Sequence, residues 1–132
     1  MKEAVIVIQN DIKDKNIIDI LNKLGITSNT NGCKYIIYIV RAMIDRNINI
    51  SKRGELKILY NEIADIYNTT KLKVIQNIYT SIQHAWDHAS PEYTQFRKQI
   101  VDIRKKVNTA LPSSKDLLNG IVKYILDNNI QI

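Results

Sequence analysis

The chain has few of the residues that cross-link or interrupt a fold: one cysteine, two prolines and four glycines in 132 residues. Cys33 has no partner for a disulfide within the chain, so a reducing compartment is the simplest inference. No apolar run is long enough to cross a bilayer as a helix, and the run over residues 4–8 is too short for a signal peptide. We therefore expect a cytoplasmic protein that needs no disulfide.

The charge is unbalanced toward the positive side. Nineteen Lys and Arg residues against 13 Asp and Glu residues give a formal net charge of +6. This excess favours a polyanionic partner, although ribosomal, membrane-surface and DNA-binding proteins all share it. With 45% hydrophobic residues, a chain of this length can bury a core in a single domain without a metal.

Apolar side chains recur at helical spacing in several segments that are separated by polar turns. The expected helices cover residues 12–24, 34–46, 55–67, 70–88 and 92–107, and a last helix follows Ser113. The sequence thus predicts an all-α domain of about six helices over residues 12–132. Residues 1–11 form a short apolar extension, which could be a strand paired across a dimer or could continue or pack on the next helix.

Single residues mark where several of these helices begin or end. Gly25 suits the end of the first helix, and Pro91 suits the first turn of the fifth. Thr70 can cap a helix by accepting a hydrogen bond from a backbone N–H. Ser113 with Asp116 resembles a capping box at the start of the last helix.

Residues 60–86 have the outline of a helix-turn-helix. Inward-facing residues of the first helix are Ile63, Ala64 and Tyr67, and those of the second are Val74, Ile78, Ile82 and Ala85, with Trp86 beside them. Asn68 and Thr69 interrupt the pattern between the two helices. In a helix-turn-helix the second helix enters the DNA major groove.

The outward side of that second helix carries Leu72 and several polar groups. Gln can bond adenine, Lys can reach guanine or phosphate, and Thr can touch a thymine methyl group. The predicted DNA-contacting residues of this segment are Thr70, Lys71, Lys73, Gln76, Tyr79, Thr80 and Gln83. An ordinary solvated helix face can have the same composition, so this assignment depends on the preceding turn and the basic surroundings.

Basic residues elsewhere are predicted to contact phosphates, which hold a protein in register but carry no sequence information. They are Lys52, Arg53, Arg97, Lys98, Arg104 and Lys105. The alternative is that these charges simply face solvent.

Other chemistries find little support. His84 and His88 are one helical turn apart, a spacing that can bind zinc, but the glutamate of the metalloprotease motif is missing. No Gly-rich phosphate loop or Ser/His/Asp arrangement is visible. We expect no catalytic residue, no metal, no cofactor and no small-molecule substrate.

The pattern Ile63-Ala64, Tyr67-Asn68-Thr69-Thr70, Val74, Ile78, Ile82 and Ala85-Trp86 resembles the C-terminal DNA-binding domain of the stage-zero sporulation protein A response regulators. Leu24-Gly25-Ile26, Gly32, Tyr35-Ile36, Lys57, Leu59-Tyr60 and Pro112 extend the match, which covers residues 17–125. The resemblance implies a six-helix transcription factor that controls entry into sporulation in a spore-forming bacterium. It also implies binding to double-stranded DNA at the nucleoid, with two copies in tandem, and hence a homodimer on DNA.

Two departures from the family are visible. Only 11 residues precede the first expected helix, too few for the phosphoreceiver domain that family members usually carry, so a stand-alone regulator is expected. The family's recognition helix is rich in arginine, with a glutamate and a histidine, whereas the matching residues here are Lys73, Ile75, Gln76, Tyr79 and Thr80. Either the preference shifts toward A·T-rich sites or base reading is lost. In the second case the protein would act by pairing with a sporulation regulator.

Overall fold

The computed structural model describes residues 14–87, 91–101 and 111–132. Within these ranges the chain forms six helices and no strand, which confirms the all-α prediction. The first helix covers residues 14–24 and is followed by α2 (Asn31–Asp45), α3 (Glu55–Ile66), α4 (Lys71–Asp87), α5 (Pro91–Ile100) and α6 (Ser114–Asp127). The predicted extension over residues 1–11 lies outside the described residues.

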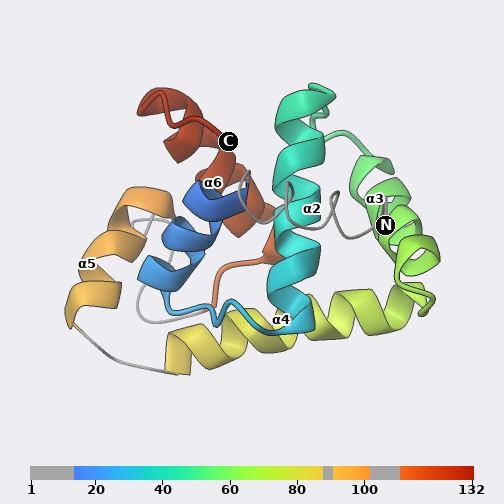
Figure 1. Ribbon diagram of the computed structural model, residues 1–132, viewed down its shortest axis with the longest axis horizontal. Coiled ribbons are helices and arrows are strands. Elements are labelled where there is room, and N and C mark those ends of the chain that lie inside the picture. Colours follow the sequence, from blue (N-terminus) through green and yellow to red (C-terminus); the bar gives the residue numbers. More distant parts are fainter. Residues whose placement is uncertain (1–13, 88–90, 102–110) are drawn as a thin grey trace, which may run out of the picture.

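Helix α2 is the centre of the fold. It stands across the middle of α4 and also packs against α3 and α6 (Figure 1). Its buried side chains include Tyr35, Ile36, Ile39, Val40 and Met43. The first helix contributes Ile17, Ile20, Leu21 and Leu24, and α6 contributes Leu117, Leu118, Ile121 and Ile125. Val122 of α6 is only partly buried.

Local hydrogen bonds explain where the helices begin and end. Gly25 has a φ of +96°, a left-handed conformation that costs glycine little, and it ends the first helix as predicted. Thr30 accepts a hydrogen bond from the Cys33 N–H, so α2 begins at Asn31, three residues before the predicted start. Ser113 caps α6 by accepting from the Asp116 N–H at 3.0 Å.

Helix α5 begins at Pro91, as predicted, but it is shorter than the sequence suggested. Its last helical residue is Ile100, and Val101 forms a bend. The predicted continuation through residues 102–107 lies outside the described residues.

Two glycines allow helices to approach each other closely. A Cβ atom on Gly32 would lie 2.9 Å from Ser81 Cβ and would also overlap the Ser81 hydroxyl and the Asn77 carbonyl oxygen. A Cβ on Gly120 of α6 would overlap the carbonyl oxygen of Ile100 at the end of α5. The absence of a side chain at Gly32 therefore sets how closely the first turn of α2 rests on α4.

An ion pair joins α3 to the region where α2 ends. The Arg46 guanidinium donates two hydrogen bonds to the Glu62 carboxylate, at 2.8 and 2.9 Å, and the Tyr38 hydroxyl donates a third at 2.6 Å. These bonds, those of Arg46 first, lower the pKa of Glu62 to about 2. The pair is partly exposed to solvent.

Candidate nucleic-acid interface

The turn between α3 and α4 has the geometry that the sequence predicts for a helix-turn-helix. Asn68 adopts a left-handed conformation with a φ of +51°. The Thr69 N–H donates to the Ala64 carbonyl at 2.9 Å, which closes the end of α3. The Thr70 hydroxyl accepts from the Lys73 N–H at 3.2 Å, so Thr70 caps α4 as predicted.

One side of α4 is firmly anchored in the core. Val74, Ile78, Ile82 and Ala85 are all buried, as predicted, and Ser81 is buried with them. Tyr67 was predicted to be buried but is 42% exposed, because it follows the last residue of α3 and leaves the inward stripe. Its ring meets Tyr35 edge-on, with centroids 5.1 Å apart. Trp86 is partly buried.

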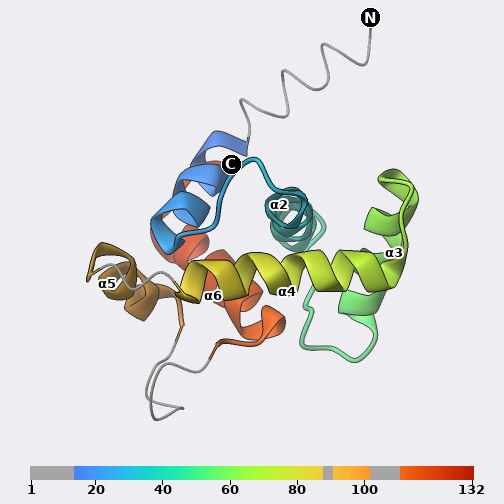
Figure 2. The same ribbon diagram turned by 90° about the horizontal axis from the view of Figure 1, so that it is seen from below.

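The opposite side of α4 is open to solvent. The helix runs along one edge of the molecule, from α3 at its start toward α5 at its end (Figures 1 and 2). Of the predicted contact residues, Thr70, Lys73, Gln76, Tyr79, Thr80 and Gln83 are exposed, and Lys71 is partly buried. Leu72, which the sequence placed on this side without assigning it a contact, is 62% exposed. The structure thus places Lys73, Gln76, Tyr79, Thr80 and Gln83 together on one accessible face.

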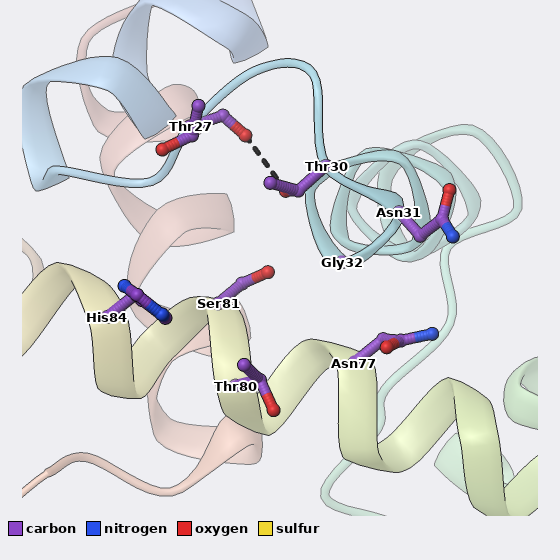
Figure 3. Close-up of a pocket in the computed structure, with 8 residues that line it drawn as sticks. All are labelled: Thr27, Thr30, Asn31, Gly32, Asn77, Thr80, Ser81 and His84. Atoms are coloured by element: carbon purple, nitrogen blue, oxygen red, sulfur yellow. Dashed lines mark hydrogen bonds between the residues drawn. The ribbon is translucent and has the colours of Figure 1, made fainter.

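A groove of about 460 Å³ lies beside this face, between α4 and the segment that leads into the first turn of α2 (Figure 3). It is lined by Thr27, Thr30, Asn31 and Gly32 on one side and by Asn77, Thr80, Ser81 and His84 on the other. Hydroxyl and amide groups of this kind can bond the phosphate and sugar oxygens that flank a helix in a DNA groove. Only Thr80 of this set was predicted from the sequence. No signal in the sequence pointed to the other residues, since Gly32 falls before the predicted start of its helix at residue 34.

The predicted basic residues of the loop before α3 lie elsewhere. Lys52 and Arg53 are exposed, but α3 separates them from the turn, and a 12-residue helix is about 18 Å long. The neighbouring Ser51 hydroxyl accepts a hydrogen bond from the Asn119 side chain, which places this loop beside α6. These two cations are therefore not next to the start of α4.

Arg97 requires a correction, because the structure buries it. The residue is 7% exposed. Its guanidinium donates to the carbonyl oxygens of Leu24, at 3.3 Å from Nη2, and Ala85, and it lies 4.3 Å from the centroid of the Trp86 ring. Burial lowers the pKa of this guanidinium from its ordinary value. Arg97 thus joins α5 to the ends of the first helix and α4, and it is not presented to a phosphate.

The other basic residues of this region have different positions. Lys98, the neighbour of Arg97, is exposed on α5. Arg104 and Lys105 lie outside the described residues, as does His88 of the two-histidine pattern. Across residues 14–87, 91–101 and 111–132, no group of three or more His, Cys, Asp or Glu side chains could hold a metal ion.

Burial and the nearby Asp14 raise the pKa of the Cys33 thiol to about 11, so this thiol stays protonated at neutral pH.

Comparison with known proteins identifies a family. The chain has no match among curated proteins. None of the helices in the described ranges has the length and hydropathy needed to span a membrane. The model of the C-terminal domain of the sporulation initiation factor Spo0A matches residues 17–125, which is most of the chain. The protein therefore belongs to this family of helical DNA-binding domains of sporulation regulators.

Proposed function

We propose that the protein is a sequence-specific regulator of transcription that inserts α4 into the major groove of duplex DNA. The observation that carries this proposal is the division of α4 into two sides. Val74, Ile78 and Ile82 fix one side in the core, while the other side lies along an edge of the molecule with polar groups exposed. Membership of a DNA-binding family supports the same conclusion.

The residues of α4 have separate roles in this proposal. Gln76 and Thr80 face base edges, where an amide can bond adenine and a threonine can contact thymine. Lys73 reaches either guanine or phosphate. Thr70 and Lys71, at the start of the helix, contact backbone phosphates. Lys98 supplies a further phosphate contact, as do Lys52 and Arg53 where the DNA extends past α3.

The net charge of +6 favours association with DNA of any sequence and makes the affinity depend on salt. Two copies side by side on neighbouring sites, forming a homodimer on DNA, would raise the specificity of such a small domain. Direct base contacts would then provide the difference in affinity between target and non-target sequences.

The test is selection of preferred sites from random duplex DNA, followed by fluorescence anisotropy at several salt concentrations. Gln76→Ala is expected to cost roughly 1–3 kcal/mol of binding free energy and to relax preference at one position of the selected site. Gln95→Ala, on the exposed surface of α5, is the matched control and should leave both affinity and preference unchanged. Failure to bind any duplex at low salt would refute the proposal.

The alternative is a protein that keeps the fold but acts by pairing with another sporulation regulator. It predicts that the selected duplexes show no common sequence and that Gln76→Ala has no effect. Light scattering of the full chain, alone and with the partner regulator, would then reveal a complex whose formation does not require DNA.

A further inference from the structure

Two large apolar side chains stand in solvent on the outward face of α4. Leu72 is 62% exposed and Tyr79 is 52% exposed. They are seven residues apart, which places them two helical turns apart on the same line. Gln76 and Gln83 fall on this line as well, since residues at i, i+4, i+7 and i+11 share one face of a helix. The line reads Leu72, Gln76, Tyr79, Gln83, and all four residues are exposed.

Along this line, the apolar side chains of Leu72 and Tyr79 alternate with the amide side chains of Gln76 and Gln83, and none of the four carries a formal charge. Guanine is usually read by Arg or Lys, and cytosine by a carboxylate, and neither type lies on the line. Thymine presents the C5-methyl group in the major groove, an apolar feature that the other standard bases lack there. Adenine offers the N6 and N7 atoms that a glutamine amide can bond with two hydrogen bonds.

The spacing along the helix fits neighbouring base pairs. At 1.5 Å per residue, Leu72 and Tyr79 are about 10 Å apart along the axis, and Gln76 lies between them. Successive bases on one DNA strand are about 3.4 Å apart, so this length corresponds to roughly three steps. The two apolar groups can therefore reach methyl groups on either side of a base contacted by Gln76.

We propose that Leu72 and Tyr79 are specificity-determining residues that contact thymine C5-methyl groups flanking an adenine read by Gln76. This inference rests on the proposed function, because it requires α4 in the major groove. It identifies the preferred target as duplex DNA whose recognised core is A·T-rich. It also explains why a leucine and a tyrosine are exposed on a helix that already buries an aliphatic stripe elsewhere.

The experiment removes single methyl groups from the DNA. In a site selected from random duplexes, each thymine is replaced in turn by deoxyuridine, which keeps base pairing and lacks only the C5-methyl group. For the wild-type protein, we expect about a fourfold loss of affinity at each contacted position, the value that corresponds to about 0.8 kcal/mol per buried methyl-sized group. Other thymines in the site should show no loss.

Variants assign the effect to the side chains. Leu72→Ala should abolish the deoxyuridine effect at one position, and Tyr79→Ala at another. Leu126→Ala is the matched control, because Leu126 is similarly exposed at 57% but lies on α6, and it should keep every deoxyuridine effect. Because these residues are exposed, thermal unfolding of all three variants should match the wild type.

The outcomes separate the two proposals. If the protein binds selected duplexes but no deoxyuridine lowers affinity, or if Leu72→Ala and Tyr79→Ala leave the effect intact, the inference is wrong and the proposed function stands. Selection of a G·C-rich core would also overturn the inference alone. If no duplex binds at low salt, the proposed function fails, and the inference fails with it.

Discussion

Helices α4 and α5 follow each other in the chain but differ in the side chains that attach them to the core. Helix α4 is anchored by aliphatic side chains such as Val74 and Ile78, which leaves its polar groups on the outside. The buried residues of α5 are Ile100 and the cation Arg97. A basic residue can therefore be exposed or buried, depending on the residues that surround it in the folded protein.

The largest expected effect is on the anchored side of α4. Ile78→Ala should lower the free energy of unfolding by about 2–5 kcal/mol, because it removes a fully buried side chain and leaves a cavity. Tyr79→Ala, one residue further along on the exposed side, should change it by less than about 0.5 kcal/mol. Urea denaturation of both variants measures the difference. Equal losses would mean that the two sides of α4 are not distinct.

The second prediction concerns the buried cation of α5. Arg97→Met should destabilise the fold by about 1–3 kcal/mol, since the Leu24 and Ala85 carbonyl groups lose their donor. The salt dependence of DNA binding should keep the same slope, because Arg97 contacts no phosphate.

Lys98→Met is the matched neighbour and should behave in the opposite way. Its stability should stay within about 0.5 kcal/mol of the wild type, while the salt slope of binding falls by about 1. Thermal unfolding and anisotropy titrations across salt concentrations measure the two quantities. A lower salt slope for Arg97→Met at full stability would reverse the assignment.

The smallest expected effect on stability comes from the exposed ion pair of Arg46 and Glu62, which contrasts with the buried cation Arg97. The pKa of Glu62 is lowered to about 2 from an ordinary value of 4.5, so its ion pair with Arg46 stabilises the fold above about pH 4.5. This contribution is lost as the pH falls through about 2, where the folded-state carboxylate becomes protonated. Because the pair is partly exposed, the change should be small. Glu62→Gln should be less stable than the wild type at neutral pH, and the gap should close in acid.

The sequence predicted those features that depend on neighbouring residues in the chain. The caps Thr70 and Ser113, the break at Pro91 and the buried stripe from Val74 to Ala85 are all local patterns, and the structure confirms them. The outward position of Gln76 and its neighbours follows from the same helical period.

What could not be predicted depends on contacts between distant segments. Arg97 looks like any surface cation in the sequence, because only folding brings the Leu24 and Ala85 carbonyl groups and the Trp86 ring around it. The groove beside α4 was missed for the same reason, since its two sides come from residues 27–32 and 77–84. Tyr67 was misplaced because one residue past a helix end is enough to change direction.

The contact between Gly32 and Ser81 has a consequence for how this protein can change. Where the first turn of α2 rests on α4, a Cβ atom at residue 32 would overlap both the Ser81 side chain and the backbone carbonyl oxygen of Asn77. A larger side chain at either position would act as a spacer, lifting α2 and widening the groove beside the outward face of α4. A smaller residue at position 81 would not make room for a side chain at position 32, because its Cβ atom would still overlap the Asn77 carbonyl oxygen. A substitution at residue 32 should therefore change the separation of α2 and α4, and with it the width of that groove, without altering any residue proposed to read DNA.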